Sequence, residues 1–203
     1  ATWSGPIGDP VVDAVVTGKN LALDHHGSPS IAATGGAFDG VFKGPFMNLA
    51  GEGKLTVGSV AIDGRGAGTV SADVSLSDGA LRIAARAPSV NTNLDVSIGL
   101  DTPHSFEGHG TLVDSEIAPL LEIAGLAEAD PGAVRGRISS SISFKGEMPN
   151  WSAATVTLDV APITATVLDV PLAMSRGLRA SLASRRVELE SVPMTIGDLA
   201  VRV

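Results

Sequence analysis

The chain has 203 residues, of which 44% are hydrophobic, and a mean hydropathy of +0.28; this excludes a disordered segment and suffices for one core or one long apolar face. Its formal charge of −8 argues against nucleic-acid binding, because phosphates must be neutralised by clustered Lys and Arg. The absence of cysteine excludes disulfides and thiolate metal sites.

Membrane and targeting signals are missing from this stretch of chain. No apolar run approaches the ~20 residues that span a bilayer, and the N-terminus lacks the pattern of a signal peptide. The chain begins at Ala1 without Met and ends at Val203 within a strand-like alternation. We therefore expect a piece of a longer polypeptide, with any membrane anchor outside it.

Three similar Gly/Pro-rich openings, at residues 4–11, 43–50 and 145–151, each precede a segment of alternating apolar residues. They indicate an internal repeat. Aromatic residues make up only 3% of the chain and Tyr is absent, so small aliphatic side chains are expected to line whatever the sheet encloses.

Period-two alternation predicts consecutive half-buried strands at residues 69–76, 80–87 and 92–100. The turn Ser77-Asp78-Gly79 supplies the Asp-Gly signal of a hairpin between the first two. Each strand has one apolar face and one polar face, which is typical of an antiparallel sheet with one wet side.

Residues 114–125 depart from this period. Ile117, Leu120, Leu121 and Ala124 recur at helical spacing and predict one short amphipathic helix, inserted in a single continuous β-region that spans residues 1–203. Asp114 or Ser115 is expected to cap its N-terminus, and Gly125 to end it. The apolar side of the helix is expected to cover an end or mouth of the sheet.

Strand alternation resumes after the helix and continues to the end of the chain. Breaks are expected at Pro162, Pro171, Gly177, Pro193 and Gly197, which turn or terminate strands. The predicted strands are residues 137–144, 155–160, 163–167, 172–175, 178–182, 186–192 and 199–203.

No constellation of reactive side chains stands out. His25 and His26 are adjacent, and His104 and His109 differ by an odd number, so a strand places each pair on opposite faces. The serines lie outside any Gly-x-Ser-x-Gly elbow. The sequence therefore predicts no enzyme activity, no metal site and no cofactor.

The glycine, proline and strand pattern of the last third resembles a known family. It consists of Lys145-Gly146-x-x-Pro149-x-Trp151, then Val170-Pro171-Leu172, and a closing run over residues 186–197. This pattern is similar to repeats of the TamB (translocation and assembly module) branch of the AsmA-like family of bridge-like proteins. A helix at residues 114–125, followed by Gly136 and a strand, also looks like that family.

The resemblance implies an all-β fold, an elongated curled antiparallel sheet or β-taco, with an apolar concave groove. It also implies a periplasmic location, a tether to the inner membrane through a segment absent from this chain, and an outer-membrane barrel partner contacted by other regions. The implied function is transport of phospholipids between the inner and outer membranes, in support of outer-membrane biogenesis.

If the apolar faces of successive strands line one groove, phospholipid acyl chains can lie in it with their headgroups at the wet opening. The periodicity leaves a closed core open as an alternative, and a scaffold for the assembly of outer-membrane β-barrel proteins is another. The positions expected to line the groove are Val74, Leu76, Leu81, Ile83, Leu94, Val96, Ile98, Leu100, Val156, Leu158, Val160, Val187 and Leu189.

Overall fold

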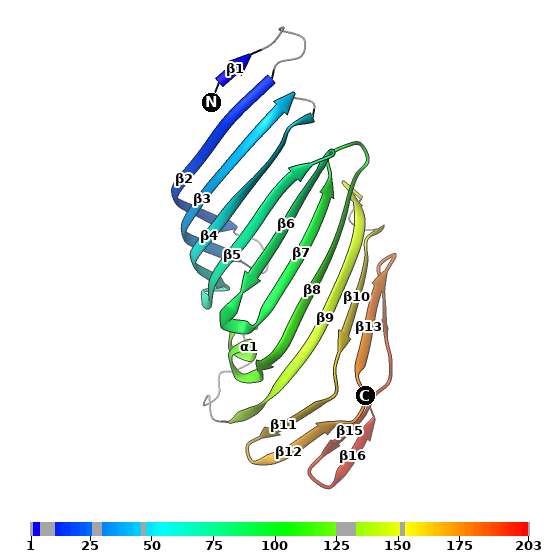
Figure 1. The fold of residues 1–203 in the computed structure, drawn as a ribbon. Coiled ribbons are helices and arrows are strands. Elements are labelled where there is room, and N and C mark those ends of the chain that lie inside the picture. Colours follow the sequence, from blue (N-terminus) through cyan, green and yellow to red (C-terminus); the bar gives the residue numbers. More distant parts are fainter. Residues whose placement is uncertain are drawn as a thin grey trace.

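The structure is a computed structural model that describes residues 2–4, 11–25, 30–45, 48–124, 133–150 and 153–202. The described residues form one curled sheet of sixteen strands, in which every pairing is antiparallel, and a single short α-helix (Figure 1). The curled, unclosed sheet confirms the predicted all-β fold.

The first nine strands form a simple meander in which each strand pairs with the next. A 3-10 helix, η2 (Pro88–Val90), joins the sixth strand to the seventh. The strands are β1 (Thr2–Ser4), β2 (Val11–His25), β3 (Ile31–Pro45), β4 (Ala50–Ile62), β5 (Arg65–Ser77), β6 (Ala80–Ala87), β7 (Thr92–Gly99), β8 (His104–Glu116) and β9 (Val134–Met148).

The sheet divides in two after β9. The next two strands both pair with β9, one along its C-terminal part and the other along its N-terminal part. One branch continues through β10 (Thr155–Val160), β13 (Leu178–Ala183) and β14 (Arg186–Leu189). The other continues through β11 (Ile163–Val167), β12 (Val170–Met174), β15 (Pro193–Ile196) and β16 (Leu199–Arg202).

A line of bends crosses the sheet from β2 to β15, and we call this line the crease. The division of the sheet after β9 is part of the crease. β10 and β11 both pair with β9 and together correspond to one long strand that is interrupted at a bend. β12 and β13 form a second interrupted strand in the same way, and β14 and β15 form a third. The crease passes through Asn20, Gly35, Gly58, Gly68, Asn91, Asp114, Ser139, Pro162, Gly177 and Ser191.

Bulges and left-handed residues produce the first half of the crease. Asn20 and Gly35 have φ values of 55° and 67°, and the β2–β3 register shifts next to Asn20. The β4–β5 register shifts beside Gly58, and Gly68 opposite has a φ of 90°. Bulges and glycines of this kind bend a strand and increase its twist, so neighbouring bends at one level fold the whole sheet.

Hydrogen bonds connect the bends in the second half of the crease. The N–H of Val113 donates to the carbonyl of Asn91 (3.1 Å), and the N–H of Asp114 donates to the Ser139 hydroxyl (2.9 Å). The carbonyl of Ser139 accepts from the N–H of Ala161 (2.9 Å). The backbone groups that leave the regular ladder at the bends thus find partners in the next strand.

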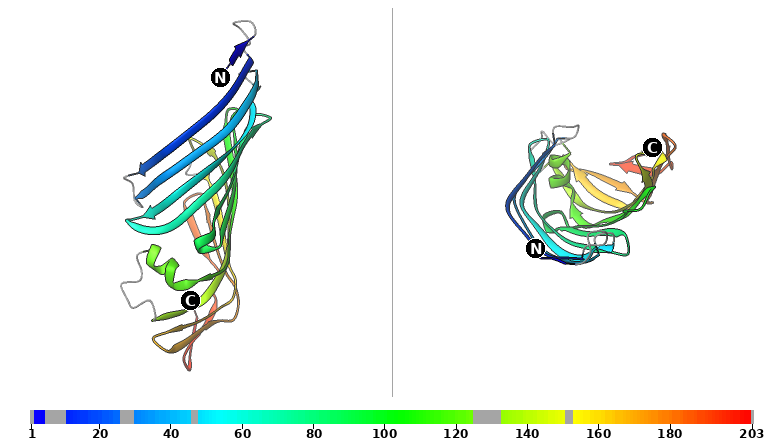
Figure 2. Two further views of the ribbon diagram at one scale, coloured as in Figure 1. Left: turned by 60° about the vertical axis from the view of Figure 1, so that its left-hand side comes forward. Right: turned by 90° about the horizontal axis from the view of Figure 1, so that it is seen from above.

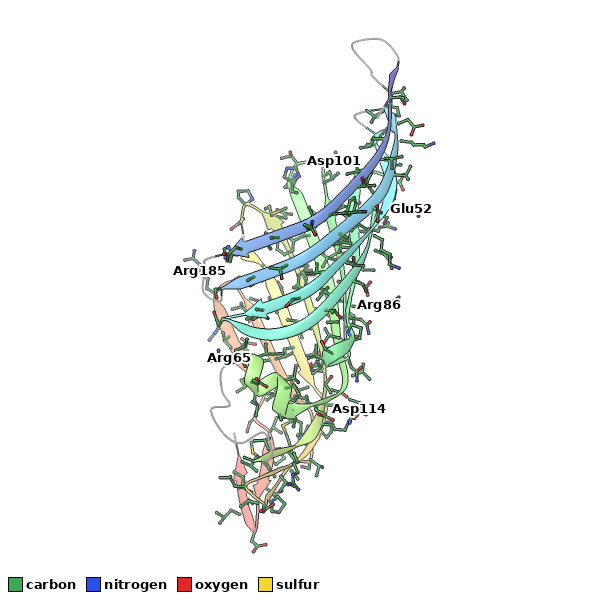
Figure 3. All side chains as sticks on the ribbon, turned by 90° about the vertical axis from the view of Figure 1, so that its left-hand side faces the viewer. Glu52, Arg65, Arg86, Asp101, Asp114 and Arg185 are labelled. Atoms are coloured by element: carbon green, nitrogen blue, oxygen red, sulfur yellow. The ribbon has the colours of Figure 1, made fainter. Side chains whose placement is uncertain are left out.

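The strand registers assign each side chain to one of two faces. Above the crease, which means the strand parts before Asn20 on β2, after Gly35 on β3 and their continuation across the sheet, one face carries the apolar members of the alternation and the other carries the polar members. Glu52, Arg86 and Asp114 project from the outside of the curl (Figure 3), so the polar face is the convex, outer face. The apolar face is the concave, inner face.

The helix α1 (Ile117–Ile123) lies within the curve of the sheet (Figure 2) and contacts both β5 and β9. The 3-10 helix η2 connects the end of β6 to the start of β7. The predicted N-terminal caps are wrong, because β8 continues to Glu116. Asp114 instead forms an ion pair with Arg137 (2.6 Å), and the buried Ser115 hydroxyl donates to the Val90 carbonyl (2.6 Å). Gly125 lies outside the described residues.

Most strand predictions are confirmed, with β6, β10 and β11 matching to the residue. Two differences concern prolines: Pro171 lies inside β12 and Pro193 begins β15. The strand expected at residues 186–192 ends at Leu189, because the chain bends at the crease between Leu189 and Pro193. His104 and His109 lie on opposite faces of β8, as expected. His26 and both tryptophan side chains lie outside what the structure describes.

The sheet is a single layer with little enclosed core. Among the described residues, the buried apolar side chains are Ala72, Phe106, Ala165, Met174 and Val192. No second sheet packs on the inner face in the described part of the chain. The closed core that periodicity left open is therefore not what this sheet forms.

We predict that Gly68→Val lowers the free energy of unfolding by about 1–3 kcal/mol, because a β-branched residue at a φ of 90° is strained. A Cβ there would also lie 2.3 Å from the Ser89 hydroxyl oxygen. The matched control is Gly66→Val in the same strand, where a Cβ meets no atom within 4 Å. Urea unfolding checks both, and equal losses would contradict the importance of the crease.

Candidate functional site: the concave apolar face

The inner face above the crease forms a continuous apolar surface, which we call the trough. Its centre is built from rows of side chains held in register across neighbouring strands. Val74, Ile83 and Val96 form one such row on β5, β6 and β7. Leu76, Leu81 and Ile98 form the next row, one pleat further along the strands.

The trough continues into the C-terminal branch. Val156 lies beside Leu182, which lies beside Val187. Leu158 and Leu189 flank Ala180 in the same way. Val187 is 70% exposed because β14 is the edge of this branch.

Twelve of the thirteen expected lining positions thus project from the inner face. The exception is Leu100, which follows the last residue of β7 and is 46% exposed. Its amide N–H donates to the carbonyl of Gly79 (2.7 Å), so it belongs to the turn region at the end of the strands.

The thirteen expected lining positions include no aromatic residue, but aromatic rings also lie on the inner face. Phe38 and Phe42 stack with ring centroids 6.4 Å apart, and Phe106 and Phe144 have the same separation. Each ring lies over glycine on a neighbouring strand: a Cβ at Gly53 would lie 2.5 Å from the Phe38 ring. The signal for this arrangement is the Gly-x-Gly pattern at residues 51–53 and 108–110, on strands next to strands that contain Phe.

Because the rings lie flat against glycines of the neighbouring strands, they do not project far into the trough. A Cβ at Gly108 would lie 2.2 Å from the Phe144 ring, and one at Gly146 would lie 2.6 Å from the Phe106 ring. Any larger residue at these glycines would lift the ring away from the sheet. The glycines therefore let large apolar rings cover the floor of the trough.

Charge is absent from the trough. Above the crease, the described inner-face positions from Val12 on β2 to Leu189 on β14 contain no Asp, Glu, Lys or Arg. Apolar side chains here are mostly half-buried rather than enclosed, because they have neighbours in the sheet and no second layer above them. A contiguous apolar surface of this kind usually marks an interaction site.

The outer face has a different character. A groove of about 1190 Å³ crosses it between two rows of polar-face side chains, from β2 to β10. Its walls carry charges of both signs, as in the register-aligned Asp39, Lys54 and Asp73. Its lining also includes Val74, Ile83, Val96 and Phe144, so this groove lies on the opposite side of the same strands that form the trough.

One row of the outer face has the residue types of a catalytic triad. Asp95, His109 and Ser143 are neighbours on β7, β8 and β9, and the His109 Nδ1 lies 3.1 Å from the Ser143 hydroxyl. All three side chains are exposed, and β9 pairs with strands on both sides, so its backbone N–H groups are engaged in the ladder. The N–H groups of β9 are therefore not free to serve as backbone oxyanion donors beside Ser143.

The described ranges contain no group of three or more His, Asp or Glu side chains that could hold a metal ion. They also contain no helix with the length and apolar character to cross a membrane.

Comparisons of the chain with protein-family models, with curated proteins and with solved structures find no match.

We predict that Phe106→Ala destabilises the fold by about 3 kcal/mol, because the Phe106 ring is 8% exposed and lies against Gly146. Phe144→Ala is the control, since its ring is less buried and its loss should be smaller. Denaturant unfolding of the two variants measures the difference. A neutral Phe106→Ala would show that ring-on-glycine packing contributes little.

Proposed function

We propose that the trough holds the acyl chains of phospholipids. The observation that carries this proposal is an uncharged apolar surface that continues over many strands on the inside of a curl and that no second layer covers. An acyl chain laid on it transfers methylenes out of water at about 0.8 kcal/mol each. The polar headgroup stays at the opening, in contact with water.

The dimensions suit more than one acyl chain. At about 4.8 Å per strand, the path from β2 to β13 through β10 measures roughly 45 Å. Half of a bilayer hydrocarbon core, the reach of one acyl chain, is about 15 Å. Several chains therefore fit end to end along the trough, which suits passage of lipid along the protein better than storage of a single molecule.

As part of the same proposal, this chain is a periplasmic segment that carries phospholipids between the inner and outer membranes and supports outer-membrane biogenesis. The tether to the inner membrane and the contact with an outer-membrane barrel partner belong to regions outside it. The sequence resemblance to AsmA-like proteins motivates these assignments, and the open, apolar-lined curl is the architecture that such a role requires.

We predict that Val96→Asp abolishes or strongly reduces bound lipid while the chain still folds. Val96 lies mid-strand in the trough between Ile83 and Gly108, and a carboxylate in an open trough can still reach water. The measurement is native mass spectrometry of the purified protein, with circular dichroism as the check on folding.

Ser97→Asp is the matched control, because it introduces the same carboxylate one residue away on the outer face. It should leave lipid binding unchanged. If the wild-type chain carries no acyl lipid, or if both variants lose it equally, the proposal fails for this segment. Capture of unfolded polypeptide in place of lipid would favour the scaffold for assembly of β-barrel proteins.

A further inference from the structure

Strand β2 has a long side with no neighbouring strand. It pairs with β3 along one side, whereas on the other side β1 covers only Val11–Asp13. In the described part of the chain, no strand pairs with that side of the twelve residues from Ala14 to His25, which we call the free edge (Figure 1). Such an edge offers backbone donors and acceptors to a further strand.

The free edge has little of the chemical protection that discourages pairing. Natural sheets usually guard an edge with charged side chains or with proline. Between Ala14 and Leu23 the free edge contains one charged residue, Lys19, and no proline. Its apolar side chains Val16, Leu21 and Leu23 are exposed. What does interrupt this edge is the bend at the crease.

The bend divides the free edge into two halves that differ in side-chain parity. Before it, Val16 and Gly18 face the trough. After it, Leu21 and Leu23 take that face: a Cβ at Gly18 would lie 3.2 Å from the Leu21 side chain, so residues three apart lie on one side of the strand. The extra residue of a bulge at Asn20, which has a φ of 55°, produces this change.

The bend also lies at the centre of the free edge, because the midpoint between Ala14 and His25 falls between Lys19 and Asn20. A bulge ordinarily discourages pairing, since a regular strand cannot follow it. A second β2, related to the first by a two-fold axis through this midpoint and perpendicular to the sheet, bends at the same level. It covers the whole free edge and stops where β1 begins to pair.

The same two-fold axis matches the side chains of the two copies. Val16 faces Leu23 of the second copy, and Gly18 faces Leu21. Both pairs lie on the apolar face only because the bulge changes the parity between the two halves. Lys19 faces an uncharged asparagine, and no facing pair within the free edge brings two charged side chains together.

We infer that two copies of this chain associate through β2, as an antiparallel pair of strands about this two-fold axis. The axis is perpendicular to the sheet, so the apolar faces of both copies lie on the same side and one sheet continues into the other. The exposed Val16, Leu21 and Leu23 gain cross-strand neighbours in the dimer. This association goes beyond the proposed function and does not require bound lipid.

Sedimentation of the purified 203-residue chain measures its stoichiometry, and the absence of cysteine allows the strand register to be tested by disulfide formation. Val16→Cys and Leu23→Cys are prepared as separate variants, mixed and oxidised. Facing residues of an antiparallel pair have Cα atoms about 4.5–5.5 Å apart, which is within disulfide range.

The mixture should give at least about tenfold more disulfide-linked dimer than either variant alone, because pairing raises the effective concentration of facing thiols. In either variant alone, the two like thiols lie seven residues apart along the strands, roughly 23 Å. Both substitutions are at exposed positions, and circular dichroism checks that the variants fold.

The matched control mixes Val16→Cys with Val187→Cys, because Val187 is an exposed apolar residue on β14, an edge strand of the described sheet. This mixture should give no linked dimer. A wild-type chain that stays monomeric at about 100 μM overturns the inference, as does linkage through Val187→Cys or between like cysteines. Absence of bound lipid would reject the proposed function and leave this result unchanged, so the two failures are distinguishable.

Discussion

The structure depends on one constraint, that the strands bend at the same level. A flat sheet with one apolar face would have to bury that face against a second layer. Here bulges, left-handed residues and broken strands coincide at the crease, from Asn20 on β2 to the interruption between β14 and β15. Because neighbouring bends are joined by backbone hydrogen bonds such as Ala161 to Ser139, the sheet curls as one piece toward its apolar side.

The curl explains how an apolar surface of this size persists on a single-layer sheet. The inner side chains shelter one another, and rings such as Phe106 lie flat over glycine in place of a second layer. The outer face keeps charges of both signs in solvent. The fold thus separates an apolar trough from a wet exterior without enclosing a core, and in the proposed function acyl chains would cover that trough.

Local pattern predicts local structure well in this chain. Residues 80–87 and 155–160 alternate cleanly and form strands with those bounds, and the face of each side chain follows from parity. The helix start was misplaced because Asp114 and Ser115 look like caps, whereas the pairing of Ser115 with Ile138 extends β8 past them. That pairing joins residues far apart in sequence and leaves no trace in local spacing.

The crease and the fork after β9 are also products of long-range register. Asn20 and Gly35 lie at the same level because of the particular register in which β2 pairs with β3. The sequence around Pro162 indicates only the end of a strand, and the pairing of both β10 and β11 with β9 is what makes it a bend within the sheet. The ring-on-glycine packing of Phe38 with Gly53 similarly depends on which strands are neighbours. The curled shape itself was expected from a family resemblance, not from periodicity.

The most direct test of the account uses the absence of cysteine, which permits single reporter thiols. Cysteine placed in turn at each position of residues 94–98 on β7 alternates between the trough and the outer face. Phospholipid should protect positions 94, 96 and 98 from a charged thiol reagent and leave positions 95 and 97 as reactive as before. Protection without this period of two, or protection of the outer positions, would contradict acyl-chain binding in the trough.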